Sequence, residues 1–150
     1  MNPKKSVFAV TKGKLLGHIL SKEGIVIDPE RIETIMRIRP PTNKRAMQYF
    51  FGKINFVRKF ISGFAEIVCP MQLMMNKYVV YKWSDEAKKA FQQSKEAITK
   101  APALVSPDFD KEFLLYTFSF DVSYATILTQ KNDEGNEVPI SYMSSNLQGA

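Results

Sequence analysis

Residues 42–61, TNKRAMQYFFGKINFVRKFI, are the stretch that most limits how this chain can fold. At 100° per residue, a helix over this stretch gathers a wide apolar arc on one side. That arc consists of Met47, Phe50, Phe51, Ile54, Val57 and Ile61. Such an arc is typical of a helix packed on a core, so the rest of the chain must supply that core.

Two further arcs share this helix. The polar arc holds Lys44, Gln48, Asn55 and Lys59, with Arg45 at its edge. The aromatic arc, nearly opposite the apolar one, holds Tyr49, Phe56 and Phe60. It fits either more protein or nucleic acid, because cations beside aromatic rings suit a sugar–phosphate surface. We expect core packing for Phe56 and Phe60, and Tyr49 fits either partner. Arg58 lies inside the apolar arc and is predicted to snorkel or to reach a carboxylate or phosphate.

Charge is divided unevenly along the chain. Residues 1–100 carry 19 Lys and Arg against 8 Asp and Glu, whereas residues 101–150 carry 2 lysines against 7 acids. The net charges are +11 and −5, so the first part favours a polyanionic partner such as nucleic acid. The switch near Pro102 indicates either two functional surfaces or a domain boundary.

Composition narrows the class of protein. With 150 residues, 45% hydrophobic and 24% charged, the chain is typical of a globular protein of one domain or two small ones. No apolar run approaches the roughly 20 residues of a membrane span, and no signal peptide is evident, so we expect no membrane partner. Cys69 is predicted to be a buried thiol in an intracellular, reducing compartment, with cytoplasm and nucleus not distinguished. One His and one Cys leave no zinc constellation.

The N-terminal part is predicted to form a small antiparallel sheet. Residues 4–10 and 14–20 have strand-like patterns, and residues 25–27 return after a turn. On this interpretation Gly17 lies in mid-strand, where it marks a bulge or the close approach of another backbone. His18 beside it is predicted to be solvated, with ligand contact as the alternative.

Helices are predicted for the middle of the chain. Side chains that can cap a helix N-terminus stand at Asp28, Thr42 and Ser84. The three helices that they open end at Pro40-Pro41, Ser62-Gly63 and Ala101-Pro102. Residues 64–68 and 71–75 are predicted to be short helical segments separated by a break at Cys69-Pro70. Residues 78–83 form a strand or an extended connector.

The last third has a different character. Residues 113–118, 124–130 and 138–143 are strand candidates, with a turn at 133–136. Three strands with no covering helix would leave an apolar face and an edge exposed. We therefore expect a β-rich domain that is unfinished within this chain.

Several motifs occur in a fixed order along the chain. The first half contains Lys14–Leu20 (KLLGHIL), Asp28–Ile32 (DPERI), Pro41-Thr42 and Phe51–Ile61 (FGKINFVRKFI). The second half contains Trp83-Ser84, Ala90-Phe91, Pro102–Leu104, Tyr116-Thr117 and Leu128–Gln130. In order and spacing these motifs resemble the polyprotein of gypsy-type LTR retrotransposons over nearly the whole chain.

The resemblance implies an α+β fold in three parts. Residues 1–28 correspond to the end of a reverse transcriptase palm, with an antiparallel hairpin. Residues 29–101 correspond to the helical thumb and connection. Residues 102–150 correspond to a truncated RNase H-like domain, with part of a mixed β-sheet.

The resemblance also implies a site. Gly17 and His18 match the region that holds the primer end, and the helix from Thr42 matches a thumb helix along the primer–template duplex. Lys44, Arg45 and Lys59 thereby become candidate phosphate contacts to a DNA or RNA–DNA duplex. Arg58 matches a family arginine, for which a structural role is the alternative.

The chain differs from the family in the catalytic motifs. The polymerase aspartates of a Tyr/Phe-x-Asp-Asp turn lie upstream of the segment that Met1 matches. The RNase H domain of the family opens with Thr-Asp-Ala-Ser, but here the stretch reads Thr117-Phe118-Ser119-Phe120, with Phe118 at the metal-binding position. A phenyl ring cannot ligate Mg²⁺. We expect neither catalytic centre and no cofactor, since Mg²⁺ would be required only by the intact family enzyme.

The sequence therefore predicts a fragment of a reverse transcriptase/RNase H polyprotein that binds primer–template and is inactive as this chain. A polymerase half supplied by a longer product is a further expected partner. Two alternatives remain open. One is a degenerate retroelement-derived globular protein with no selected activity, and the other is an unrelated basic helical nucleic-acid-binding module.

Overall fold

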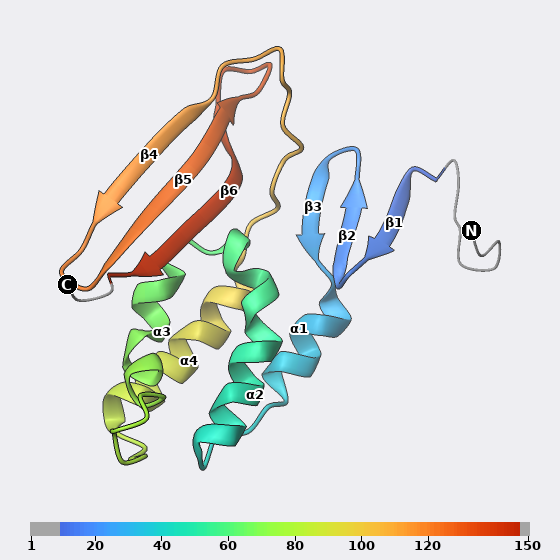
Figure 1. Cartoon of the computed structure of the whole chain (residues 1–150). Coiled ribbons are helices and arrows are strands. Elements are labelled where there is room, and N and C mark those ends of the chain that lie inside the picture. Colours follow the sequence, from blue (N-terminus) through green and yellow to red (C-terminus); the bar gives the residue numbers. More distant parts are fainter. Residues whose placement is uncertain (1–9, 148–150) are drawn as a thin grey trace, which may run out of the picture.

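Two three-stranded antiparallel sheets flank a layer of helices in the computed structural model, which describes residues 10–147 (Figure 1). The first sheet consists of β1 (Lys12–Leu15), β2 (His18–Ser21) and β3 (Gly24–Ile27). The helices are α1 (Pro29–Met36), α2 (Lys44–Ile54), the 3₁₀ helix η2 (Asn55–Phe60), α3 (Phe64–Leu73) and α4 (Asp85–Thr99). The second sheet consists of β4 (Leu114–Ser119), β5 (Ser123–Lys131) and β6 (Glu137–Asn146). Apart from Val10, the strand predicted over residues 4–10 lies outside the described residues.

The single strand predicted over residues 14–20 is wrong. Leu15 pairs with His18, so β1 and β2 form a hairpin whose turn is Leu16-Gly17. Both turn residues have positive φ, 51° at Leu16 and 82° at Gly17, which is the backbone of the tightest hairpin turns. The sequence pattern did not indicate this turn, because leucine is uncommon at positive φ.

Local capping sets where the helices begin. The Asp28 carboxylate accepts a hydrogen bond from the Glu30 amide, and Ser84 accepts one from the Ala87 amide, as predicted. The predicted cap at Thr42 is wrong, because Asn43 accepts from the Ala46 amide and α2 begins one residue later. The predicted continuous helix also changes at Asn55 into the tighter η2.

The predicted break at Cys69-Pro70 does not occur, and α3 runs through Pro70. A proline inside a helix removes one hydrogen bond, and here the buried apolar side of α3 outweighs that cost. That side consists of Phe64, Ala65, Val68, Cys69 and Met71.

The core lies between the helices, as the apolar arc of residues 42–61 predicts. Met47, Phe50, Ile54, Val57 and Ile61 are buried there, and Phe51 packs against them while half-buried. They meet the apolar side of α4, which consists of Ala87, Ala90, Phe91 and Ile98.

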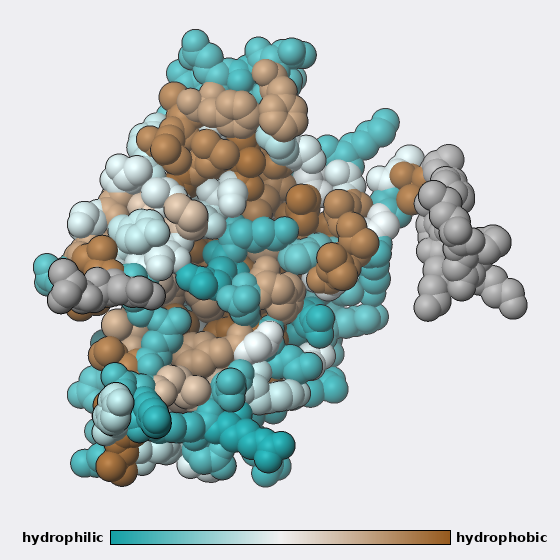
Figure 2. Space-filling view, viewed as in Figure 1, coloured by the Kyte–Doolittle hydropathy of each residue, from teal (hydrophilic) through white to brown (hydrophobic). Residues whose placement is uncertain are grey.

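The second sheet packs on the helices mainly through β6, which lies against α3 and η2. The Ala65 amide donates to the Ser144 hydroxyl at 2.9 Å across this junction. The strand order is β4-β5-β6, and the described strands are antiparallel throughout. Apolar surface gathers over this sheet in Figure 2. Leu115 of β4 and Met143 of β6 are exposed. The predicted open face and edge are therefore present in the described part of the domain.

The segment after α4 connects the two sheets. Leu104 forms a β-bridge with Ile25 of β3, with N–O distances of 2.7 and 2.9 Å, and the Val105 amide donates to the Pro139 carbonyl. The predicted division at residues 28/29 and 101/102 stays a prediction. Across residues 10–147, no helix combines the length and apolar character that a membrane span requires.

Candidate nucleic-acid interface

The β1–β2 turn lies directly against α1 and η2. A Cβ added at Gly17 would come within 3.1 Å of Arg31 Nε and 3.5 Å of a ring carbon of Phe56. The positive φ of Gly17 disfavours a side chain as well. The Asp28 amide donates to the Gly17 carbonyl at 3.1 Å and fixes the turn to the start of α1. The predicted mid-strand position of Gly17 is therefore wrong, and the groups that would come closest to an added Cβ are side chains, not another backbone.

His18 is buried, with 9% of its surface exposed, so the predicted solvated state is wrong. Its ring stacks on Phe60 with centroids 5.4 Å apart and meets Phe56 edge-on at 5.5 Å. The Arg31 guanidinium lies 5.0 Å from the centre of the Phe56 ring, and the Lys59 amine lies 5.4 Å from the Phe60 ring. We call Gly17, His18, Arg31, Phe56, Lys59 and Phe60 the His18 cluster.

Burial lowers the pKa of His18 below its usual 6.5, and the Lys59 charge adds to this effect. The Leu15 and Phe56 backbone groups favour the protonated ring and oppose this shift in the pKa without reversing it. The ring is therefore neutral at pH 7.

Acid is expected to weaken the fold through His18. Because the folded-state pKa lies below the unfolded-state value of 6.5, the unfolded chain binds the proton more readily. Stability should therefore fall as pH drops through 6.5 and level off below the folded-state pKa. Urea unfolding midpoints measured against pH check this, and a His18→Gln variant should lose that part of the pH dependence. An identical profile in the variant would contradict the assignment.

Lys14 forms ion pairs with two carboxylates at the start of α1. Its amine lies 3.1 Å from Asp28 Oδ2 and 3.2 Å from Glu30 Oε1. The hydrogen bond to Asp28 is the main reason that the pKa of Lys14 is raised. Lys14 therefore supplies little free positive charge to a ligand.

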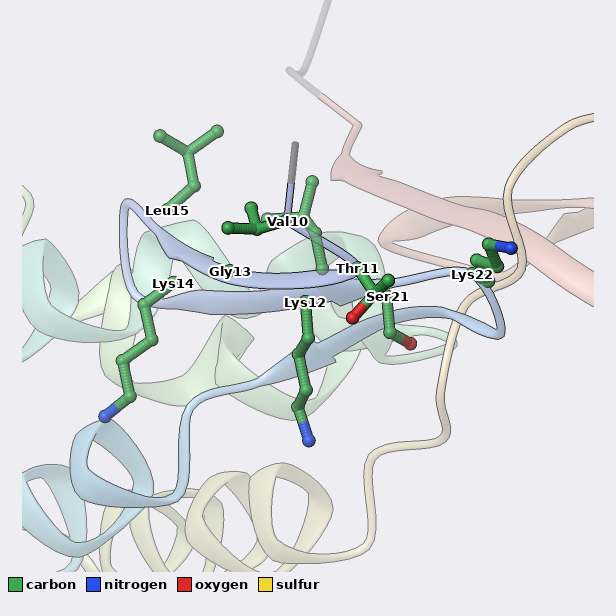
Figure 3. A pocket seen from close by; sticks show the side chains of 9 residues that line it. Val10, Thr11, Lys12, Gly13, Lys14, Leu15, Ser21 and Lys22 are labelled. Atoms are coloured by element: carbon green, nitrogen blue, oxygen red, sulfur yellow. The ribbon is translucent and has the colours of Figure 1, made fainter. Parts of the chain in front are cut away.

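A hollow of about 770 Å³ lies along the β1–β2 hairpin. Figure 3 shows the side chains that line it. Leu15 points away from the side on which Lys12 and Lys14 extend. Lysines and hydroxyl groups line this hollow together with a few apolar side chains, and the cations of the His18 cluster are not among the residues that line it.

An exposed side of α2 carries cations and an aromatic ring. Arg45, Tyr49, Gly52 and Lys53 stand at helical spacing on this side. The Lys53 amine lies 5.2 Å from the centre of the Tyr49 ring, and Tyr49 is 57% exposed. A Cβ added at Gly52 would have no heavy atom within 4 Å. We call these four residues the α2 outer face.

Lys44 already has partners within the protein. Its amine donates to the Asn76 carbonyl at 2.7 Å and to the Val79 carbonyl at 2.6 Å. These bonds hold the loop between α3 and α4 against the start of α2. The nucleic-acid contact predicted for Lys44 stays a prediction.

Among residues 10–147, no carboxylate forms an ion pair with Arg58. Its guanidinium donates to the Ser144 carbonyl at 2.6 Å, so the structural alternative is the one that the geometry supports. Beside it a groove of about 480 Å³ separates η2 from β5 and β6, with Lys59 and Tyr124 on its walls.

The structure brings Gly17, His18 and Lys59 together and leaves Arg45 at the opposite end of α2. At 1.5 Å per residue this 11-residue helix is roughly 16 Å long. Sequence reasoning missed Arg31 and Lys53. The spacing of Lys53 four residues after Tyr49 was an available signal, whereas the contact of Arg31 with Phe56 depends on tertiary packing.

Phe118 lies on β4 opposite Ala125 and is 45% exposed. Within residues 10–147, no group of three or more His, Cys, Asp or Glu side chains is placed to hold a metal ion. The assignment of Phe118 to the metal-binding position of the RNase H motif stays a prediction.

Comparison with known proteins places these features in a family context. Residues 83–150 match the family described as an RNase H-like domain found in reverse transcriptase. Over all 150 residues the chain is 29% identical to the Tf2-3 and Tf2-4 transposon polyproteins of Schizosaccharomyces pombe, and it spans only 11% of their length.

Solved structures show the same fold. The foamy viral protease-reverse transcriptase in complex with double-stranded DNA matches 97% of this chain and 30% of its own, with a TM-score of 0.79 and 22% identity. The same enzyme in complex with an RNA/DNA hybrid matches 97% of this chain and 20% of its own, with a TM-score of 0.78 and 22% identity. The predicted α+β class and the predicted resemblance to retrotransposon polyproteins are confirmed.

Proposed function

We propose that this chain, a reverse transcriptase/RNase H-like fragment of the retrotransposon type, binds double-stranded nucleic acid without reading its sequence. The ligand is a DNA duplex or an RNA–DNA hybrid. The α2 outer face and the His18 cluster form the contact surface.

One observation carries the proposal. The α2 outer face combines Arg45, Lys53 and the exposed Tyr49 ring with a glycine that has open space in front of it. Glycine in a helix interior lowers stability by about 0.5–1 kcal/mol relative to alanine, and no described contact at Gly52 offsets this loss. A bare backbone flanked by cations suits the close approach of a phosphate–sugar chain.

The comparisons and the charge distribution support the same ligand. The foamy viral enzyme of the same fold was solved with double-stranded DNA and with an RNA/DNA hybrid. The net charge of +11 over residues 1–100 favours a polyanion. Residues 101–150 have a net charge of −5, which repels a polyanion, so we expect the second sheet to contribute little to binding.

Replacing Arg45, Lys53 and Lys59 with Gln is expected to weaken duplex binding and to reduce its salt dependence. The log–log slope of affinity against salt should decrease by about one for each phosphate interaction that the substitutions remove. The protein should stay folded. Exposed Arg45 contributes little to stability, and half-buried Lys53 and Lys59 each lose one cation–aromatic contact, about 0.5–1 kcal/mol. Fluorescence anisotropy over a salt series measures both affinity and slope.

A matched control removes the same charge elsewhere. Gln at Lys82, Lys89 and Lys100, which are all exposed, should leave most of the affinity intact. Gly52→Ala gives a second test, since a new methyl group should slightly stabilise α2 and yet weaken binding. Equal reductions in affinity in the two triple variants would mean that binding depends on net charge alone and not on the positions of these residues. Unchanged binding in Gly52→Ala would contradict the close approach of the phosphate–sugar chain to the backbone at Gly52.

We propose further that this chain, by itself, holds neither catalytic centre. Phe118 offers no oxygen to Mg²⁺, and residues 10–147 contain no group of three or more His, Cys, Asp or Glu side chains placed to hold a metal ion. Primer extension and hybrid cleavage assays with Mg²⁺ or Mn²⁺ should therefore detect no turnover. Phe118→Asp should remain inactive, because one carboxylate does not make a metal site. Cleavage by a nuclease-free preparation of either protein would refute this.

A further inference from the structure

His18 occupies an unusual position for a group that titrates near neutral pH. The ring is 9% exposed and is held by Phe56 and Phe60. Among the described residues, no hydrogen-bond partner faces its buried Nε2 atom. Protonation would give the ring a second N–H to satisfy and would place a positive charge in an apolar setting.

The charges around the ring have mostly one sign. Lys59 on η2 and Arg31 on α1 both disfavour a charged imidazole. Asp28, at the start of α1, already accepts from Lys14 and from the Glu30 amide. Arg58 is turned toward the Ser144 carbonyl on β6. Among the described residues, no carboxylate forms an ion pair with Lys59 or Arg31, so the cluster in the free protein carries positive charge.

We propose that nucleic-acid binding at this surface is coupled to the uptake of a proton by His18. The inference rests on the proposed function, and it adds a regulation of the same site. A phosphate beside Lys59 and Arg31 would supply the missing negative charge without touching the ring. The same phosphate would therefore favour the imidazolium that the free protein disfavours.

The direction of the linkage follows from these charges. If the duplex-bound protein holds the proton more tightly than the free protein, affinity rises as pH falls through the interval between the two pKa values. Each unit by which binding raises the pKa of His18 is worth up to tenfold in affinity. Acid thus weakens the free fold and strengthens the complex, and both effects originate in one ring.

The chain has a single histidine, so its ring proton gives an unambiguous NMR signal. We would titrate this signal in the untagged 150-residue chain, free and saturated with a short DNA duplex, at fixed ionic strength. The free protein should titrate below 6.5 and the complex at a higher pH. In Lys59→Gln the shift on binding should shrink, because no cation then holds a phosphate on that side of the ring. In His18→Gln the affinity should lose its pH dependence between about pH 5.5 and 7.5.

The outcomes separate this inference from the proposed function. Salt-sensitive binding with an unchanged His18 titration would overturn the proton linkage alone. A titration that moves to lower pH on binding would overturn it as well. Absence of duplex binding at every pH would overturn both. If His18→Gln fails to fold, the wild-type titration still decides the question.

Discussion

Gly24→Ala is expected to abolish the connection between the first sheet and the segment after α4, and to destabilise the protein more than any other single methyl group added at a described glycine. The new Cβ would lie 2.1 Å from the Leu104 carbonyl oxygen, which belongs to the backbone and cannot rotate away. Gly24 also has a backbone φ of 135°, which residues with a side chain rarely adopt. Backbone strain of this kind costs about 1–3 kcal/mol, and overpacking typically adds about 1–3 kcal/mol.

Urea unfolding of purified variants measures this destabilisation, and two glycines provide controls. Gly13 lies in the same sheet without a positive φ, and its nearest neighbour would be Val10 at 3.9 Å. Gly52 faces open space on α2. Gly13→Ala should change stability little, and Gly52→Ala should raise it by about 0.5–1 kcal/mol. A Gly24→Ala protein as stable as these two would disprove the clash.

Phe50→Ala is expected to cost about 3–5 kcal/mol, a large share of the total stability of a domain of this size. Phe50 is fully buried, and its ring centre lies 4.7 Å from that of Phe91 on α4. Removing the ring leaves a cavity between α2 and α4 that the helices cannot close without moving. Thermal and urea unfolding, followed by circular dichroism, should both shift strongly.

Tyr49→Ala is the control for Phe50→Ala, since it removes an aromatic ring from the neighbouring position. Tyr49 is 57% exposed, so its removal should cost only the interaction with Lys53, about 0.5–1 kcal/mol. The variant should remain folded and bind duplex less tightly. Similar decreases in stability in the two variants would mean that α2 is buried on both sides.

The features that sequence reasoning predicted correctly are mainly local. The caps at Asp28 and Ser84 depend on residues two and three positions away, and the apolar arc of residues 42–61 depends only on helical periodicity. The turn at Leu16 was missed because leucine is an uncommon residue at positive φ, so no composition signal marked it.

The features that sequence reasoning missed depend on partners distant in the chain. The Lys95 amine is buried and donates to the Met36 and Ile38 carbonyls, a role that its place on an amphipathic helix does not reveal. Burial lowers the pKa of this lysine. The candidate site follows the same rule. Family motifs indicated Gly17, His18 and Lys59 separately, but only the packing of β2 on η2 brings Arg31 and two phenylalanine rings to the same place.

The bridge between Ile25 and Leu104 has a consequence for how the molecule assembles. Ile25 precedes all the helices in the sequence and Leu104 follows them, so the two paired residues are far apart along the chain. Closing so long a loop costs conformational entropy before any pairing energy is gained. The bridge is therefore expected to form late in folding, after α4 has docked on α2, and β3 has an unpaired edge until then. During synthesis this edge is open to pairing with other chains, so the slowest step of folding is also the one most exposed to aggregation.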